Sequence, residues 1–150
     1  MHYKLKLKEL RLEKNLSQRE IANIIGIAQQ TYNHYEVGEN IIPLKHLNSL
    51  ANYFDVSIDY ILGLTEIRKY QNSIKEIDMI KSGNILKDFR RSNKLTQTKL
   101  ASILNTFHTV VVDYEHGKNL IATPFLYTIC KKYGVSADYL LGKIDGPKNL

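Results

Sequence analysis

The chain has 150 residues, of which 43% are hydrophobic and 24% are charged, and its formal net charge is +6. This composition is ordinary for a globular protein, and the length allows either one average domain or two small helical domains. No apolar run approaches the roughly 18 residues that cross a bilayer, the N-terminal MHYKLKLKEL lacks a signal-peptide core, and one cysteine excludes an internal disulfide framework, so we expect a cytoplasmic protein that does not enter a membrane.

The first 66 residues predict five short helices. The second helix begins after Ser17, a good N-cap residue, and it is expected to bury one apolar face. Gly26 tolerates a positive φ and separates the second helix from the third. The fourth helix begins near Pro43, and the fifth runs from Ser57 to Gly63, a cap-to-glycine pattern. The apolar residues expected inside the second helix are Ile21, Ile24 and Ile25.

A further helix is predicted over Glu66–Ile80, EIRKYQNSIKEIDMI, before the breaker pair Ser82-Gly83. Its apolar residues recur at spacings of 3, 4 and 3, which gives one narrow stripe. This stripe either packs on a neighbouring domain or forms a short homodimer seam. The residues of the stripe are Ile67, Tyr70, Ile74 and Ile77.

The rest of the chain repeats the beginning. A shift of 79 residues aligns Leu7–Gly63 with Leu86–Gly142 without a gap, and 19 of the 57 pairs are identical. Thr96 takes the place of Ser17 as a cap, and Asn105 takes the place of Gly26 at the turn. We therefore predict an all-α fold. Two tandem five-helix domains, residues 1–66 and 83–150, are expected to be joined by a short helical linker, residues 67–82.

The repeated pattern LSQxxxAxxxGxxxxTxxxYExG, followed by proline and then VSxDYxLG, resembles the Cro/repressor type (Xre-like) of helix-turn-helix domain. The resemblance covers nearly all of the first copy and most of the second. It implies a lambda-repressor-like fold that binds double-stranded DNA with its third helix in the major groove. It also implies a transcriptional regulator, most simply a repressor.

The first copy carries residues suited to reading bases. Its third helix is expected over about Ala28–Glu36, with Thr31, Tyr32 and Tyr35 facing inward. Glutamine and asparagine can bond bidentately to adenine in the major groove. The resemblance further implies that Gln18, at the start of the second helix, contacts phosphate beside the groove. The outward residues that we predict to read bases are Gln29, Gln30, Asn33 and His34.

The second copy departs from the first at its reading helix. The two copies share no identity over the ten positions from Ile25 to His34. Gln97 matches Gln18, and the Lys118-Asn119 pair resembles the family loop that contacts the DNA backbone. Asp113 would meet phosphate with like charge. The other outward residues are His108, Thr109 and Val112, and Phe107 precedes them.

Charge is divided unequally between the copies. Residues 1–66 hold 7 Lys and Arg against 8 Asp and Glu, a charge of −1, whereas residues 67–79 give +1 and residues 80–150 give +6. One interpretation is that both copies touch one DNA, the first reading bases and the second neutralising phosphate. The alternative is a protein-interaction module, such as an anti-repressor or antitoxin-like adaptor, that binds its partner through the Phe107–Val112 face.

The remaining features indicate structure rather than chemistry. The resemblance implies two structural ion pairs, Arg11 with Glu36 and Arg90 with Glu115. The five histidines, His2 among them, lack metal-ligand spacing, so no metal site is expected. No phosphate loop or nucleophile motif is present. We expect no cofactor and no enzymatic activity.

Overall fold

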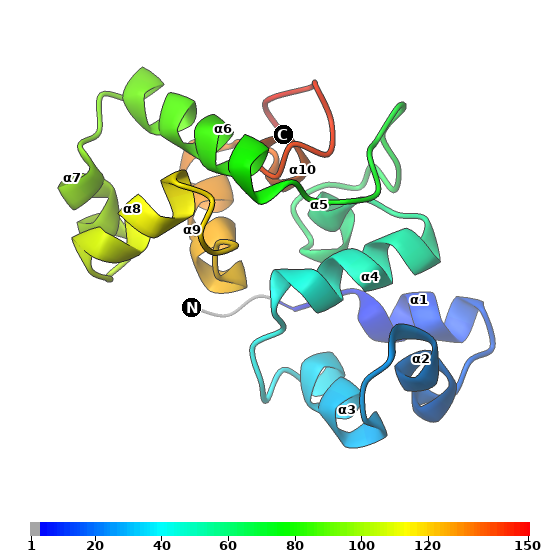
Figure 1. Ribbon diagram of the computed structural model, residues 1–150. Coiled ribbons are helices and arrows are strands. Elements are labelled where there is room, and N and C mark those ends of the chain that lie inside the picture. Colours follow the sequence, from blue (N-terminus) through cyan, green and yellow to red (C-terminus); the bar gives the residue numbers. More distant parts are fainter. Residues whose placement is uncertain (1–3) are drawn as a thin grey trace. The chain divides into compact units, whose positions relative to one another are not determined.

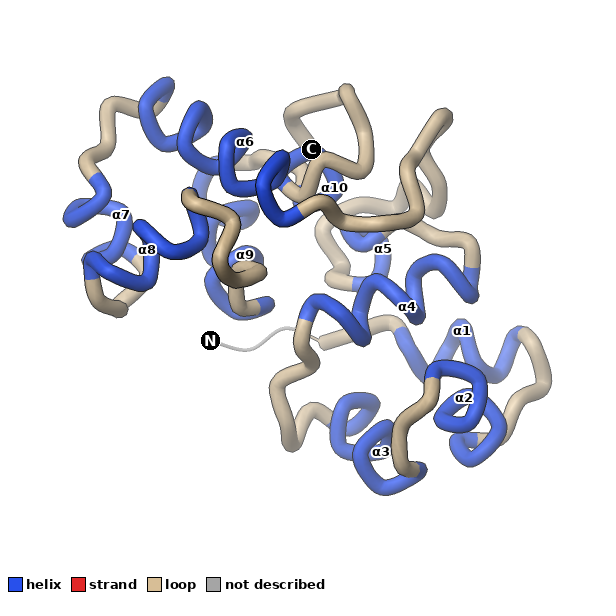
Figure 2. The backbone as a smooth tube through the Cα atoms, viewed as in Figure 1, coloured by secondary structure: helices blue, strands red, loops and turns tan. Residues whose placement is uncertain are grey.

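The computed structural model describes residues 4–150, and the regular elements of this part of the chain are all helices (Figures 1 and 2). The chain divides into unit 1, Met1–Tyr70, and unit 2, Gln71–Leu150. Unit 1 contains α1 (Leu7–Glu13), α2 (Gln18–Ile25), α3 (Gln29–Val37), α4 (Leu44–Phe54) and α5 (Ile58–Ile61). Unit 2 contains α6 (Met79–Ser92), α7 (Gln97–Ile103), α8 (His108–Glu115), α9 (Thr123–Tyr133) and α10 (Ala137–Leu140). The predicted all-α fold with two tandem five-helix domains is confirmed.

Local sequence signals set the ends of the helices that matter for the site. Ser17 and Glu20 form a capping box at the start of α2, and Thr96 caps α7 through the N–H of Lys99. The chain turns after α2 at Gly26, with φ 78°, and after α7 at Asn105, with φ 56°. Both residues adopt the left-handed backbone at low cost, so the two turns keep one geometry with different side chains.

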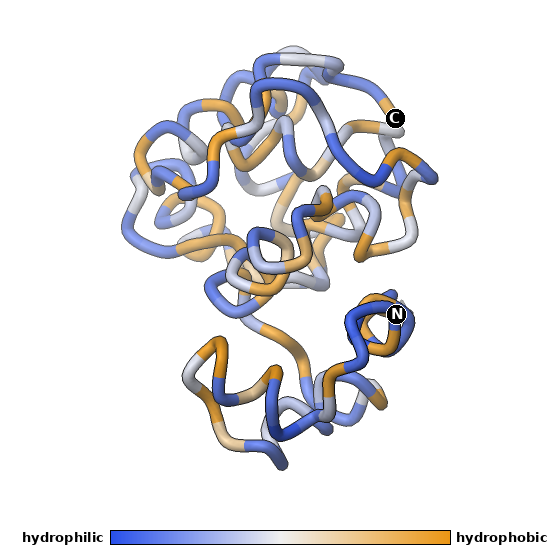
Figure 3. Tube along the Cα trace, turned by 90° about the vertical axis from the view of Figure 1, so that its right-hand side faces the viewer, coloured by the Kyte–Doolittle hydropathy of each residue, from blue (hydrophilic) through white to orange (hydrophobic). Residues whose placement is uncertain are grey.

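Each unit packs its helices around an apolar core. In α2, Ile21 and Ala22 are buried and Ile25 is half-buried, but Ile24 is 46% exposed. The expectation that Ile24 is buried is therefore wrong, because it lies roughly 100° around the helix from the middle of the buried face. Figure 3 shows polar and apolar residues interspersed along the helices. Within residues 4–150, no helix combines the length and the hydropathy that crossing a membrane needs.

The helix predicted over Glu66–Ile80 is not formed, which corrects the predicted helical linker. Residues 65–78 are irregular, with Asn72 at φ 58°, and α6 begins only after Asp78, whose carboxylate accepts from the N–H groups of Ile80 and Lys81. Ser82-Gly83 was predicted to end a helix and instead lies inside α6. The apolar stripe does not exist without the helix, so the predicted homodimer seam on it has no basis.

The segment after α5 returns across unit 1 instead of forming a helix. The N–H of Ser57 donates to the carbonyl of Arg68 at 2.5 Å, and the buried Asp59 accepts from the hydroxyl of Tyr70 at 2.8 Å. These hydrogen bonds draw the backbone of residues 64–70, the first return segment, away from helical geometry. Arg68 also forms a bidentate pair with Glu13 at 2.6 and 3.0 Å.

Unit 2 has a matching return segment, residues 143–150. The N–H of Ser136, the counterpart of Ser57, donates to the carbonyl of Lys148 at 2.8 Å. Positions 68 and 148 differ by 80, one more than the shift that aligns the copies, so the two segments do not align without a gap. The structural repeat therefore extends past Gly63 and Gly142, where the sequence repeat ends.

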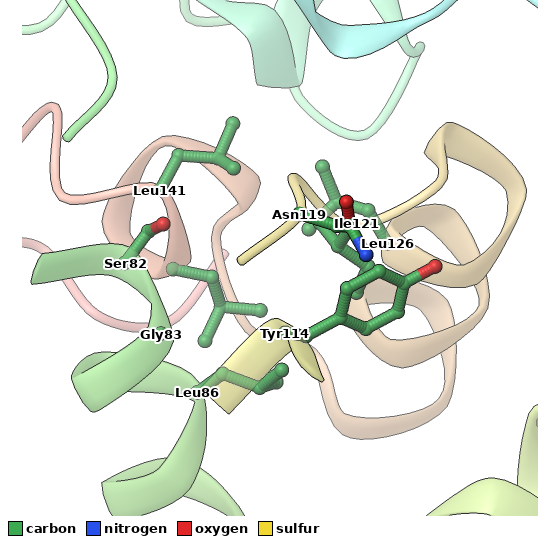
Figure 4. A pocket seen from close by; sticks show the side chains of 9 residues that line it. Ser82, Gly83, Leu86, Tyr114, Asn119, Ile121, Leu126 and Leu141 are labelled. Carbon is green, nitrogen blue, oxygen red and sulfur yellow. The ribbon is translucent and has the colours of Figure 1, made fainter. Parts of the chain in front are cut away.

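A long first helix distinguishes unit 2. α6 has 14 residues and α1 has 7. The added turns of α6 cross the end of α8, where Gly83 allows the backbones to meet. A Cβ at Gly83 would lie 2.5 Å from the carbonyl oxygen of Tyr114 and 2.8 Å from that of Glu115. Beside this crossing, Leu86 and Tyr114 line a cavity of about 20 Å³, which is room for one water molecule (Figure 4).

One buried ion pair ties the first helix of each unit to its third. Arg11 donates to both carboxylate oxygens of Glu36 at 3.0 and 2.8 Å, and Arg90 does the same to Glu115 at 2.6 and 2.9 Å. Each guanidinium also donates to the backbone carbonyl at the end of the following loop, that of Leu16 or Leu95.

The environment of the carboxylates lowers their pKa values. Burial alone would raise the pKa of Glu36 and Glu115, but hydrogen bonds and charge from the paired arginine hold each pKa below its ordinary value of 4.5. Both carboxylates are therefore ionised near neutral pH. These pairs fix the position of the third helix in each unit.

We predict that Gly83→Ala destabilises unit 2. In an exposed helix the same substitution would stabilise by about 1 kcal/mol, but here the new methyl group meets two carbonyl oxygens, at a cost of about 1–3 kcal/mol. Hydrogen exchange of unit 2 amides in the full chain measures this change. Asn84→Ala, at the exposed neighbour in α6, is the control and should not destabilise. Equal stability of the two variants would contradict the close crossing.

We also predict that Glu115→Gln costs about 3–5 kcal/mol near neutral pH, because it leaves the Arg90 guanidinium buried without its charged partner. The folded pKa of Glu115 is lowered, so the stabilisation by the carboxylate is present above pH 4.5 and is lost as the pH falls through the folded pKa.

The difference in unfolding free energy between the wild type and Glu115→Gln should therefore shrink on acidification. Urea denaturation at a series of pH values tests this. Glu76→Gln, at an exposed position of unit 2, provides the baseline. A difference that is constant down to strongly acidic pH would contradict the role of the ion pair.

Candidate nucleic-acid interface

α2 and α3 of unit 1 form a helix-turn-helix, and α3 presents polar side chains on its outer face. Gln29 and Gln30 are exposed in the first turn, while Tyr32 and Tyr35 are buried on the opposite face. The N-cap residue Ala28 supplies no side-chain hydrogen bond. The first N–H groups of α3 and the two amide side chains therefore lie together at one exposed helix end.

A hydrogen-bond network connects the buried ion pair with the outer face of α3. The Gln18 Nε2 donates to Asn33 Oδ1 at 2.9 Å and lies 3.4 Å from Glu36 Oε1. An ionised carboxylate only accepts, so the amide nitrogen of Gln18 must face Glu36. That orientation requires the oxygen of Asn33 to face Gln18. The ion pair thus sets the polarity of both amides, and the Asn33 Nδ2 is left as the donor of that side chain.

His34 is held at the far end of this face. Its Nε2 lies 3.4 Å from the Glu39 carboxylate, and its Nδ1 lies 3.2 Å from the Asn40 amide nitrogen. Both partners belong to the loop after α3. The structure therefore places Gln29, Gln30 and Asn33 on one stretch of the helix and ties His34 to the loop.

Unit 2 repeats the network with a different outer partner. Gln97 Nε2 donates to Glu115 Oε1 at 3.0 Å, which leaves Gln97 Oε1 facing outward, 3.2 Å from His108 Nε2. Because this oxygen can only accept, His108 Nε2 carries the proton. His108 occupies the position of Gln29. In unit 2 the second-helix glutamine therefore bonds to the first turn of the third helix, whereas in unit 1 it bonds to Asn33 in the second turn.

The outer face of α8 mixes apolar and polar side chains. Phe107 is 78% exposed, Thr109 is exposed and Val112 is half-buried. Asp113 shares this face, but the Lys118 ammonium lies 4.0 Å from its carboxylate. The like-charge repulsion from phosphate that was expected of Asp113 is therefore partly offset.

Two positions beside the third helix reverse their charge between the units. The exposed Glu20 of unit 1 corresponds to the exposed Lys99 of unit 2, and Glu39 corresponds to Lys118. The Ser17 N–H donates to the Glu20 carboxylate and lowers its pKa, so the start of α2 carries a fixed negative charge. At the corresponding end of α7, Lys99 places a positive charge instead.

Asn119 is exposed beside Lys118 in the loop after α8, and it also lines the cavity of Figure 4. In the described part of the chain, no group of three or more His, Cys, Asp or Glu residues is placed to hold a metal ion. His2 lies outside the described residues. The sequence analysis did not predict the direction in which the hydrogen bonds of these residues point. The acceptor-only carboxylates were the signal that could have given it.

Comparison with known proteins gives the same domain twice. A helix-turn-helix family model matches residues 7–61 and again residues 86–140. The chain is 44% identical over 64 residues to YobD of Bacillus subtilis (strain 168), an uncharacterized HTH-type transcriptional regulator. The aligned residues cover 43% of this chain and 57% of YobD. It is 43% identical over 58 residues to the HTH-type transcriptional regulator AnsR of the same organism, 39% of this chain and 50% of AnsR.

A phage protein is also similar. The chain is 34% identical over 77 residues to the cryptic phage CTXphi transcriptional repressor RstR of Vibrio cholerae, 51% of this chain and 69% of that protein. The chain thus spans about half of YobD and AnsR and about two thirds of RstR. Both matched regions contain the capped second helix, the turn and the third helix held by the Arg–Glu pair. The chain therefore belongs to the Cro/repressor type of helix-turn-helix transcriptional regulators and carries the domain of this family twice.

Proposed function

We propose that the protein is a sequence-specific DNA-binding transcriptional regulator that acts as a repressor, with α3 of unit 1 reading bases in the major groove. The observation that carries this proposal is the set of amides on the outer face of α3: Gln29 and Gln30 are exposed, and the half-buried Asn33 is held in a fixed orientation by Gln18 and the buried ion pair. The similarity to a phage repressor favours repression, in which the bound protein occludes a promoter.

The amides of unit 1 supply the sequence preference. Gln29 and Gln30 are exposed and can each bond bidentately to adenine. Asn33 directs its Nδ2 as a donor toward a base acceptor, while its oxygen stays bonded to Gln18. Gln18 is thus a positioning residue beside the phosphates, and His34 lies at the edge of the contact, toward Glu39.

Unit 2 supplies most of the electrostatic attraction. Residues 80–150 carry a charge of +6, and Lys99 in α7 and Lys118 in the loop after α8 are exposed. Each phosphate that a lysine neutralises releases condensed counterions, which strengthens binding at low salt. The Lys118-Asn119 loop and Gln97 complete this phosphate-facing surface. Unit 1 thus supplies the amide contacts to bases, and unit 2 supplies most of the phosphate contacts.

We predict that Gln29→Ala combined with Gln30→Ala lowers discrimination between a selected operator and random DNA. Each bidentate amide contact is worth about 1–3 kcal/mol of discrimination, whereas the phosphate contacts remain. Fluorescence anisotropy titration of both duplexes at several salt concentrations measures the effect. Gln71→Ala, at an exposed glutamine outside both helix-turn-helix regions, is the control. Unchanged discrimination would overturn the assignment of the reading residues.

Lys118→Ala should lower the slope of log K against log salt by about 1, with an equal loss on all sequences. The reciprocal change, Glu39→Lys in unit 1, should raise the slope, because it places a cation at the corresponding position of the other unit. Lys148→Ala, at an exposed lysine of the second return segment, serves as the comparison. A slope that responds to Lys148 but not to Lys118 would move the phosphate contact away from α8.

A further inference from the structure

The outer face of α8 carries apolar groups at two positions where α3 carries amides, and a phenylalanine takes the place of the alanine before α3. Phe107, Thr109 and Val112 stand at the positions of Ala28, Gln30 and Asn33. Phe107 is the most exposed large hydrophobic residue of the described chain, at 78%. Phe107 is therefore available to contact a ligand, and the half-buried Val112 lies on the same face.

The support beneath this face shares its arginine, glutamate and glutamine with unit 1 and differs in its outer partner. Arg90 holds Glu115, Glu115 accepts from Gln97, and Gln97 accepts from His108 at the start of α8. The ring of His108, between Phe107 and Thr109 in the sequence, is thereby held against α7. The two units share a way of presenting the third helix and differ in the chemistry that it presents.

The surroundings of the face fit a polyanion. Lys99 and Lys118 are exposed, and the one carboxylate among the outward residues of α8, that of Asp113, lies 4.0 Å from the Lys118 ammonium. An apolar protein partner would need to bury these lysines or meet them with acidic groups. A DNA groove meets them with phosphate and also contains one apolar group on its floor, the C5-methyl of thymine.

We propose that unit 2 reads sequence through thymine methyl groups, which contact Phe107, the methyl of Thr109 and Val112. This inference rests on the proposed function, since it requires α8 to enter the major groove as α3 does. Phenylalanine and the threonine methyl are both suited to this contact. Unit 1 then selects bases by hydrogen bonding and unit 2 by methyl contact, so the ten divergent positions mark two different readouts on one scaffold.

The test replaces thymine with uracil, which removes the C5-methyl and keeps every Watson–Crick hydrogen bond. A site is first selected from random DNA with the full chain, and each thymine of this site is then changed to uracil in turn. Burial of one methyl group predicts that affinity falls about fourfold at each contacted position. Phe107→Ala and Val112→Ala should each bind thymine and uracil equally at one or more of these positions.

Two further variants separate the possible results. Gln29→Ala with Gln30→Ala should lower overall discrimination but keep the uracil effect, because unit 2 is intact. Met79→Ala removes an exposed apolar side chain of α6 and should change nothing. Thermal melts check that Phe107→Ala is folded, as the exposure of this residue predicts.

Specific binding without a uracil effect at any position would overturn this inference and leave the proposed function standing. So would a uracil effect that Phe107→Ala and Val112→Ala both keep. If Phe107→Ala leaves DNA binding intact and instead abolishes self-association in light scattering, the face binds protein and the inference fails. If no sequence is enriched by selection, the proposed function itself fails.

Discussion

The buried pair of arginine and glutamate is the constraint on which both units depend. Arg11 with Glu36, and Arg90 with Glu115, join the first helix to the third across 25 residues of chain. A carboxylate buried in this way must stay ionised and fully bonded, so each hydrogen bond that it accepts has a fixed direction. The carboxylates fix the amide orientation of Gln18 and Gln97, and these amides in turn orient Asn33 and His108 on the third helix. A pair that holds the fold together thus also determines which atoms a ligand meets.

The duplication shows which positions this constraint leaves open. The arginine, the glutamate and the second-helix glutamine are the same in both units, and the turn keeps its left-handed residue, as glycine in one unit and asparagine in the other. The outer positions of the third helix do not contribute to the ion pair, the turn or the core. They diverged completely, and with them two flanking charges changed sign. One scaffold therefore holds an amide surface in a nearly neutral unit and a methyl-rich surface in a basic one.

Sequence reasoning was reliable where the cause is local or lies in the repeat. Ser17 and Thr96 cap their helices, Gly26 and Asn105 turn the chain, and the ion pairs form as the resemblance implied. It failed where distant contacts decide. Residues 66–78 have a helical pattern, but pairing of Arg68 with Ser57 pulls the backbone onto unit 1. Gly83 was interpreted as a helix breaker, but its small size allows α8 to cross α6 there. The exposure of Ile24 follows from which face of α2 packs against the core.

The stretch of chain between the first return segment and unit 2 is short. Tyr70 is bonded to Asp59 in unit 1, and the N–H of Ile74 donates to the carbonyl of Lys143 in unit 2. Only Gln71, Asn72 and Ser73 lie between these anchors, and a residue of extended chain spans at most about 3.6 Å. Short tethers of this kind give the second module a high effective concentration once the first is bound. If both units bind one DNA, as proposed, contacts that are individually weak in unit 2 would then add to overall avidity.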